Sequence, residues 1–234
     1  FRAPHHCITP QAMAGGGNGL MPGEVSLACH GVLFMDEFNL FSTKTVEVLR
    51  QPMESGHILI DRVNGKVEYP ADFMLVAAMN PCKCGYYPDR NRCSCTPAQV
   101  RAYFGRLSRP LLDRIDVCVQ VPRIKYEDMV YDGKDLYTNE YMRSTVERVF
   151  NIQKERFADE KYSLNSSIPA ADVSRYCILD REAENLMNSI YDSCDLSARG
   201  YHKLLKVART IADIDGSEYI MAEHICEASG YRMV

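Results

Sequence analysis

Two short apolar runs, each followed by polar side chains, mark the first half of the chain. The run Val32–Met35 leads directly into Asp36 and Glu37. The run Phe73–Met79 leads into Asn80. Short unbroken apolar runs predict strands that are buried on both faces, as in parallel sheets. Because open α/β sheets bind ligands at the carboxyl ends of their strands, we expect Asp36, Glu37 and Asn80 at the same end of the sheet.

The acidic pair has two interpretations. In nucleotide hydrolases an Asp at this place helps to hold Mg²⁺ on the phosphates, and the following Glu orients and deprotonates the attacking water. A neutral amide such as that of Asn80 can orient a water between phosphate and carboxylate. Alternatively, Asp36 and Glu37 begin a helix, whose dipole favours acids at its N-terminus.

The segment after the acidic pair predicts a helix. Ser42 is a good N-cap, and Val46, Leu49 and Met53 fall on one helical face. Gly56 is placed to end this helix. Two buried strands joined through such a segment form a parallel α/β unit.

A β-hairpin is predicted before the second strand, because two short β-rich runs flank Asn64 and Gly65. Arg62 and Lys66 stand near the tip of this hairpin. They are either solvated turn charges or contacts for a polyanion such as DNA.

The chain changes character after a polar connector that runs from Pro122 to about Asn139. Helical periodicity covers residues 140–157, and Asp180 and Ser197 cap two further helices. Gly216 ends the second of these, and a last helix covers roughly residues 222–231. We therefore predict an α/β domain over residues 1–135 and a small all-helical domain over residues 136–234.

Two arginines stand at places where a solvated charge is hard to explain. Arg114 comes just before the apolar run Val117–Val121, which predicts another strand. It either reaches nucleotide in a neighbouring subunit or pairs with Asp113 or Asp116. Arg199 falls in the first turn of its helix, where a cation opposes the macrodipole unless an anion lies close by. A phosphate would supply that anion, and a stray surface arginine is the alternative.

Composition and charge limit the classes of protein. The chain has 234 residues, 46% of them hydrophobic and 25% charged, with a net charge of −4. This is typical of a globular protein and gives no global attraction to nucleic acid. Between Lys83 and Arg114, however, Lys and Arg outnumber Asp and Glu. This local positive charge suits phosphates or a partner's acidic site. No apolar run is long enough to span a membrane.

Ten cysteines raise the question of metal or disulfides. Most are scattered through apolar segments, and a chain of this size needs few disulfides, so we predict a reducing cytoplasm. Cys82, Cys84, Cys93 and Cys95 are different, because they bracket an irregular polar stretch. Four thiols so close together can close a tetrahedral zinc site, although C-x-C spacing is tighter than usual. Two structural disulfides are the alternative.

Nine stretches together resemble the magnesium-chelatase-like AAA+ ATPases and, within them, the YifB/ComM competence family. They are Phe1–His6, Pro22–Ala28, Gly31–Glu37, Leu49–Pro52, Tyr69–Phe73, Ala77–Cys82, Pro110–Asp116, Ser197–His202 and Val207–Asp213. The resemblance spans nearly the whole chain and implies a partial AAA+ core with a parallel sheet, followed by a helical lid.

The resemblance also implies residue roles. Asp36 and Glu37 are similar to the Walker B pair, Asn80 to sensor 1 and Arg114 to the arginine finger. Arg199 is similar to the sensor 2 arginine, and with Asp36 it would contact ATP and Mg²⁺. The hairpin that carries Arg62 and Lys66 resembles the pre-sensor 1 hairpin, and the loop at residues 15–19 resembles the helix-2 insert. The cysteine quartet follows the family's pattern.

Two departures from the family are visible. No G-x-x-x-x-G-K-[ST] occurs in the chain, and the family's Walker A segment and Lon-like domain precede the position of Phe1. We therefore expect ATP hydrolysis by the full-length protein and weak or no ATP binding by this fragment. The family often has Gly where Arg109 stands, so this chain has an added charge beside the predicted finger.

Three functions are compatible with these residues. The first is a hexameric AAA+ motor, a DNA helicase or branch-migration factor in recombination of imported DNA. The second is the ATPase subunit of a chelatase that inserts Mg²⁺ into a porphyrin, although the cysteine quartet fits the competence branch better. The third is a non-catalytic interaction module.

Overall fold

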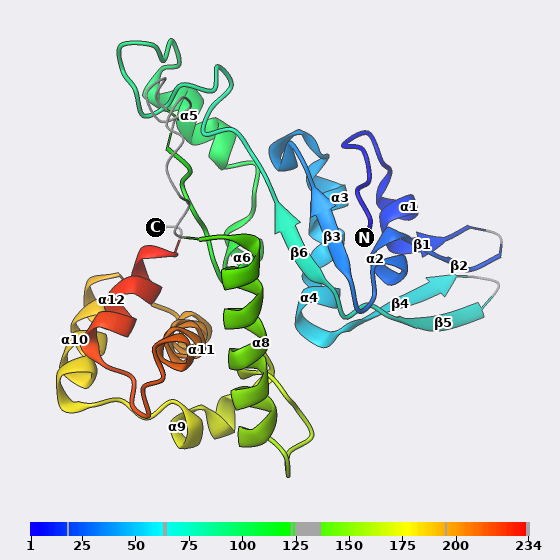
Figure 1. The fold of residues 1–234 in the computed structure, drawn as a ribbon. Coiled ribbons are helices and arrows are strands. Elements are labelled where there is room, and N and C mark those ends of the chain that lie inside the picture. The colour runs from blue at the N-terminus through cyan, green and yellow to red at the C-terminus, as the bar shows by residue number, and fades with distance from the viewer. Residues whose placement is uncertain (18, 63–64, 123, 125–136, 195, 233–234) are drawn as a thin grey trace. The chain divides into compact units, whose positions relative to one another are not determined.

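The computed structural model describes residues 1–17, 19–62, 65–122, 124, 137–194 and 196–232. The chain forms two compact units, Phe1–Arg114 and Ile115–Val234 (Figure 1). The first unit is mixed α/β with a small parallel sheet, and the second is helical. The predicted fold class is confirmed. No helix among the described residues is both long and apolar enough to cross a lipid bilayer.

The parallel pair of strands forms as predicted. Strand β3 (Val32–Met35) pairs in parallel with β6 (Met74–Ala77) along its whole length. Arg2 adds an isolated parallel bridge to Leu33 on the other side of β3. The connection between β3 and β6 carries helices and a hairpin, as a parallel pair requires.

The prediction that both strands are buried on both faces is wrong. Strand β3 alternates between buried Leu33 and Met35 and half-buried neighbours. In β6, Met74 is 64% exposed. Successive side chains of a strand point to opposite faces, and in the described part of the chain only one face of this sheet is covered by a core. An unbroken apolar run therefore does not reveal how many layers lie against it.

The predicted single helix after Ser42 is three short ones. They are α3 (Thr43–Glu47), the 3₁₀ turn η2 (Val48–Arg50) and α4 (Pro52–Ser55). Ser42 caps α3 by accepting a hydrogen bond of 3.1 Å from the Thr45 amide. Gly56 ends α4 in the left-handed region, with φ of 71°. The break before Pro52 has a physical cause, because proline has no N–H to donate to the preceding turn, although Gln51 itself keeps helical dihedrals, with φ of −66° and ψ of −54°.

The hairpin is confirmed for the residues that the structure describes. Strand β4 (His57–Arg62) pairs antiparallel with β5 (Gly65–Pro70). Asn64, at the predicted tip, lies outside the described residues. A second antiparallel ribbon consists of β1 (Gly15–Gly16) and β2 (Met21–Pro22), and β1 contacts strand β4 of the hairpin. Gly15 has φ of 101°, and a Cβ there would lie 2.6 Å from backbone atoms, so only glycine fits.

The remaining helices of the first unit are short. They are α1 (Pro10–Ala14), α2 (Glu24–Leu27), α5 (Pro97–Phe104) and α6 (Arg109–Leu112). Helices α1, α2 and α3 pack on the sheet around buried Met13, Val25 and Val46. Helix α5 has a complete capping box, in which Thr96 and Gln99 each accept from the other's backbone amide.

The prediction of a strand at Val117–Val121 is wrong. The segment has no regular secondary structure and no strand pairing, and Val119 is exposed. The Cys118 amide donates instead to the Tyr231 carbonyl, at 2.7 Å. A β-strand needs a second strand to pair with, and among the described residues no strand pairs with this run.

The second unit confirms the predicted helices. The long ones are α8 (Asn139–Arg156), α10 (Arg181–Ser193), α11 (Ala198–Asp215) and α12 (Ala222–Gly230), and between α8 and α10 lie η3 (Asn165–Ser167), η4 (Ala170–Asp172) and α9 (Val173–Tyr176). Asp180 and Ser197 accept capping hydrogen bonds of 2.7 and 3.1 Å. Gly216 ends α11 in the left-handed region. Helix α11 lies at the centre, with Leu204 and Ala208 fully buried.

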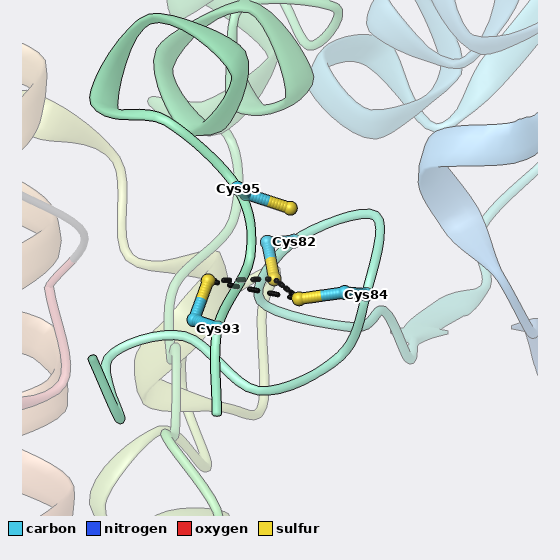
Figure 2. Close-up of side chains that lie close together, drawn as sticks. All are labelled: Cys82, Cys84, Cys93 and Cys95. Atoms are coloured by element: carbon cyan, nitrogen blue, oxygen red, sulfur yellow. Dashed lines mark hydrogen bonds between the residues drawn. The ribbon is translucent and has the colours of Figure 1, made fainter. Parts of the chain in front are cut away.

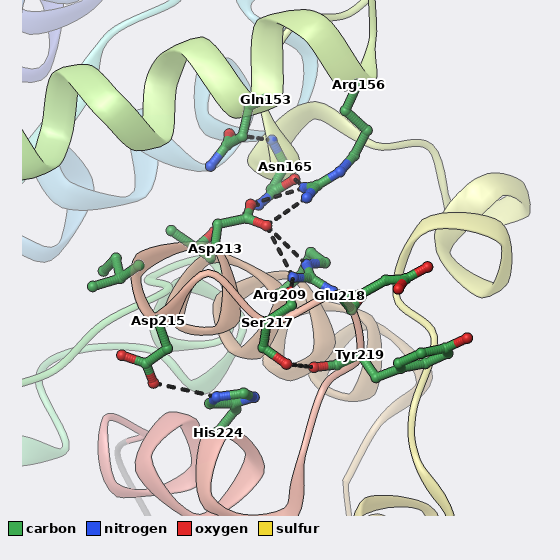
Figure 3. A network of polar contacts seen from close by, with 12 residues as sticks. Gln153, Arg156, Asn165, Arg209, Asp213, Asp215, Ser217, Glu218, Tyr219 and His224 are labelled. Carbon is green, nitrogen blue, oxygen red and sulfur yellow. Dashed lines mark hydrogen bonds and ion pairs between the residues drawn. The ribbon is translucent and has the colours of Figure 1, made fainter.

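A buried ionic network ties α8, η3 and α11 together (Figure 3). Asp213 accepts hydrogen bonds from Arg156 at 2.5 and 2.8 Å, from Arg209 at 3.0 Å and from Asn165 at 2.8 Å. Burial alone would raise the pKa of Asp213, but the hydrogen bonds from Arg156 and Asn165 and the two guanidinium charges lower it. Gln153 completes the network by accepting from the Asn165 amide at 2.9 Å.

Candidate functional site

The acidic pair stands at the carboxyl end of β3. The Asp36 carboxylate accepts a hydrogen bond of 2.8 Å from the Glu37 amide. Glu37 has φ of 51° and ψ of 43°, the left-handed region that non-glycine residues rarely adopt. Such a conformation costs about 1–3 kcal/mol, and Leu20 and His30 are the other described non-glycine residues with positive φ. Both side chains are exposed.

Asn80 follows β6 at the same end of the sheet. Pairing continues past the strands, because the Ala78 amide donates to the Met35 carbonyl at 3.0 Å and the Phe38 amide donates to the Ala78 carbonyl at 2.9 Å. Asn80 comes two residues later and is exposed. The register therefore places a carboxylate pair and an amide at one end of two adjacent parallel strands.

His6 is a residue of this site that the sequence reasoning missed. Its Nδ1 lies 3.4 Å from a carboxylate oxygen of Glu37. The half-buried His6 ring packs edge-on against Phe41, with ring centroids 6.4 Å apart. No local pattern reveals this contact, because it depends on the parallel bridge between Arg2 and Leu33 that brings the N-terminal segment alongside β3.

Arg114 follows α6 and is held by the first unit. Its side chain is 10% exposed and pairs with the Glu54 carboxylate, and its Nη1 donates to the Pro110 carbonyl at 2.6 Å. The sequence suggested Asp113, Asp116 or a neighbouring subunit's nucleotide as the partner of Arg114, and not Glu54. The pair lines an open hollow of ≈ 440 Å³ together with Glu47 and Arg50. Hydrogen bonds from Ser108 and then Arg50 lower the pKa of Glu47, which favours its ionised form beside Arg50.

Arg199 lies in the first turn of α11, as predicted, and its side chain is exposed. Two further cations follow at helical spacing. Lys203 pairs with Asp116 at 2.7 Å, and Lys206 donates to the Ser166 carbonyl at 3.0 Å. Burial lowers the pKa of Lys206. The spacing of four and three residues puts these side chains on one helix face. The sequence alone therefore indicates a row of three cations on this helix.

Arg62 and Lys66 lie on opposite strands of the hairpin and are exposed. Arg62 stands opposite Gly65 in the register, and Lys66 stands opposite Asp61. The hairpin thus presents two cations and one carboxylate near its end.

The cysteine quartet is brought together in the loop between β6 and α5 (Figure 2). The Sγ of Cys82 lies 3.3 Å from that of Cys84 and 3.8 Å from that of Cys93. Cys84 and Cys93 are 3.6 Å apart, and all four sulfurs, including that of Cys95, lie within 4.8 Å of one another. Zinc–sulfur bonds of about 2.3 Å in a tetrahedron give sulfur–sulfur distances of roughly 3.8 Å. The donor set and its spacing therefore fit one zinc ion.

The thiols also show why a cation suits this cluster. Hydrogen bonds from the Tyr86 amide and then from Cys82 lower the pKa of Cys84 to about 6. Desolvation raises the pKa of Cys93 to about 11. A close group of thiols does not ionise together without a positive charge. All four are free thiols in the structure, and no disulfide joins them.

Comparison with known sequences gives the family to which this chain belongs. Residues 1–129 match the sequence profile of magnesium chelatase, subunit ChlI, and residues 137–232 match that of the ChlI C-terminal region. The chain belongs to this magnesium chelatase ChlI family of AAA-type ATPases.

Particular relatives lie within the family. The chain is 42% identical over 233 residues to the competence protein ComM of Haemophilus influenzae and 40% identical over 234 residues to YifB of Escherichia coli. It is 24% identical over 227 residues to the magnesium-chelatase 38 kDa subunit of Chlorobaculum parvum. The alignments cover 99%, 100% and 94% of this chain, and 45%, 45% and 56% of those proteins. The chain thus spans less than half the length of ComM and YifB.

Proposed function

We propose that the full-length protein is an ATP-hydrolysing AAA+ motor that assembles into a hexameric ring and acts on DNA, as a helicase or branch-migration factor in recombination. The observation that carries the proposal is the register of β3 and β6, which brings Asp36, Glu37 and Asn80 to one end of the sheet. Membership of the ChlI family supports it. A cytoplasmic location remains a prediction.

Each polar residue has a role in this proposal. Carboxylate oxygens suit Mg²⁺, so Asp36 would hold that ion, and Glu37 would orient and deprotonate the attacking water. Asn80 would position the same water, and His6 would hold the Glu37 carboxylate in place. ATP with Mg²⁺ supplies the phosphoryl group and the charge that stabilises its transfer. A Walker A segment in the longer protein would cradle the phosphates.

The two arginines would sense the nucleotide from other parts of the assembly. Arg114 would reach the nucleotide of a neighbouring subunit, where a guanidinium stabilises the charge of phosphoryl transfer. The Glu54 pair would hold it ready in the isolated chain. Arg199 would contact nucleotide from the helical lid, at a helix N-terminus where an anion is favourable.

The DNA part of the proposal rests on the hairpin and on the relatives. Arg62 and Lys66 are exposed near the end of the hairpin and would contact phosphates. The relative with 42% identity is named a competence protein. The proposed DNA contacts therefore lie on the hairpin β4–β5, whereas the carboxylates and Asn80 follow strands β3 and β6.

The experiment that tests this function is ATP hydrolysis by the purified full-length protein, with and without DNA. We expect hydrolysis that single- or double-stranded DNA stimulates, together with DNA binding by the ring. Hydrolysis that DNA does not stimulate, from a ring that does not bind DNA, would contradict the DNA part of the proposal and leave the ATPase part standing.

A second candidate is the ATPase subunit of a chelatase. It is favoured by the alignment to the magnesium-chelatase 38 kDa subunit, which covers 94% of this chain. Co-purification with a large chelatase subunit would support this candidate. A non-catalytic module is the third, and absence of any hydrolysis by the full-length protein would support it.

We further propose that Cys82, Cys84, Cys93 and Cys95 hold one structural zinc ion. Elemental analysis of protein purified under reducing conditions should give about one zinc per chain, because the four thiols complete a tetrahedral site. Cys84→Ser should lose the metal. Cys194→Ser, which changes an exposed cysteine in the helical unit, should keep it, and equal zinc in both variants would rule out this set of ligands.

A further inference from the structure

The cysteine loop presents a tip whose shape is fixed by its own backbone. We call residues 82–95 the cysteine knuckle. Between the two cysteine pairs the chain folds into successive turns, in which the Asp89 amide donates to the Tyr86 carbonyl at 2.8 Å and the Cys93 amide donates to the Asp89 carbonyl at 2.8 Å. The four sulfurs form the base of the knuckle (Figure 2). The chain between the cysteine pairs is therefore held by its own backbone hydrogen bonds as well as by the cysteine cluster.

The exposed charges of the knuckle are mostly positive. Lys83, Arg90 and Arg92 are exposed, and Asp89 is the knuckle's one acidic residue. The Asp89 carboxylate accepts from the Asn91 amide at 3.0 Å and lies 3.9 Å from Arg92. Four thiolates around one zinc ion would keep negative charge at the base, but the Tyr87 amide donates to one of these sulfurs, and the three cations of the knuckle are exposed to solvent.

The positive field continues beyond the knuckle into the next two helices. Arg101 lies in α5, Arg106 follows it and Arg109 begins α6, and all three are exposed. The stretch 83–109 thus carries six Lys and Arg residues (83, 90, 92, 101, 106 and 109) and one acid, in a chain whose net charge is −4. Such a local positive field can attract a polyanion even though the net charge of the whole chain is negative.

Aromatic rings lie among these cations. Tyr86 is 49% exposed at the tip. The guanidinium of Arg90 lies over the Tyr87 ring, 5.3 Å from its centroid. An exposed ring beside cations is the arrangement that binds single strands without sequence preference, because bases stack on the ring while the cations contact phosphates.

We propose that the cysteine knuckle binds single-stranded nucleic acid, with Lys83, Arg90 and Arg92 on phosphates and a base stacked on Tyr86. The inference rests on the proposed function, since it gives the DNA-acting motor a second contact apart from the hairpin. The role of the sulfur cluster is then to hold the knuckle rigid, so that binding costs less conformational entropy.

The test is the salt dependence of binding, measured by fluorescence anisotropy of a labelled oligothymidine with the full-length protein. Removal of three phosphate contacts in Lys83→Ala/Arg90→Ala/Arg92→Ala should lower the slope of log K against log salt by about 2. Tyr86→Ala should weaken binding about fivefold to a hundredfold and leave the slope unchanged, because stacking is not ionic. The two variants therefore separate charge from stacking.

The matched control is Lys154→Ala/Lys161→Ala/Arg181→Ala, which removes the same charge from exposed positions of the helical unit and should leave the slope near the wild-type value. Zinc content and melting temperature show whether the knuckle is intact. If the triple knuckle variant loses zinc, Arg90→Ala alone should lower the slope by about 0.7.

The outcomes distinguish this inference from the function on which it rests. A wild-type slope in the knuckle variant, with a lower slope in Arg62→Ala/Lys66→Ala, would overturn the knuckle site and leave a DNA-acting motor. No binding of oligothymidine or duplex by the wild-type protein would overturn both. Loss of heparin binding in the triple knuckle variant, with oligothymidine binding unchanged in both that variant and Tyr86→Ala, would assign the surface to a different polyanion and overturn nucleic acid as its partner.

Discussion

Glu37→Gln is expected to lower the ATPase kcat of the full-length protein by about 10²–10⁴-fold, the range for loss of a positioned general base. The amide keeps the size of the side chain but accepts no proton from water. ATP binding should persist, because Asp36, the proposed Mg²⁺ ligand, is unchanged. Steady-state phosphate release and binding of a fluorescent ATP analogue measure the two effects separately.

The matched control for this variant is Glu140→Gln, which makes the same change at an exposed position in the first turn of α8. It should retain wild-type kcat. A Glu37→Gln protein that hydrolyses ATP within a factor of about two of wild type would remove Glu37 from the mechanism.

Local signals in the sequence predicted the local parts of this fold. Ser42, Asp180 and Ser197 were expected as helix caps, and each accepts the capping hydrogen bond. Gly56 and Gly216 were expected to end helices, and both adopt the left-handed region. Caps and turns depend on neighbours within a few residues. Their positions can therefore be predicted from the sequence alone.

Features that depend on distant neighbours were not predictable in the same way. Val117–Val121 has the composition of a strand, but pairing depends on a partner that the run itself does not specify. The contact of His6 with Glu37 and that of Glu54 with Arg114 join segments far apart in the chain. Only the three-dimensional arrangement reveals them. The convergence of the four cysteines was predictable because they are close in sequence.

The Asp213 network was missed for a related reason. Asp213 and Arg209 stand four residues apart on α11, which the sequence shows, but nothing in it indicates burial of both charges. The Asp213 side chain is 1% exposed and that of Arg209 is 2% exposed. Arg209 also donates to the Glu218 carbonyl at 2.6 Å and to the Ser217 carbonyl. The network therefore joins helix α11 to the turn that follows it as well as to α8.

Asp213→Asn is expected to destabilise the helical unit by about 3–5 kcal/mol, the cost of removing one partner of a buried ion pair. The change leaves Arg156 and Arg209 next to each other without the carboxylate that both contact. Chemical denaturation followed by circular dichroism measures the loss. The matched control is Asp215→Asn two residues away, where the carboxylate is 57% exposed and pairs with His224 at 3.3 Å, and a loss below about 1 kcal/mol is expected there.

The difference between wild type and Asp213→Asn should depend on pH with a definite sign. The folded-state pKa of Asp213 is lowered from its ordinary value of 3.8, so the carboxylate stabilises the folded state above that pH. As pH falls through the folded-state pKa, Asp213 takes up a proton and this contribution is lost. The free energies of unfolding of the two proteins should therefore converge in acid and differ most near neutral pH. A difference that stays constant from pH 7 to about pH 3 would show that Asp213 acts through packing rather than through its charge.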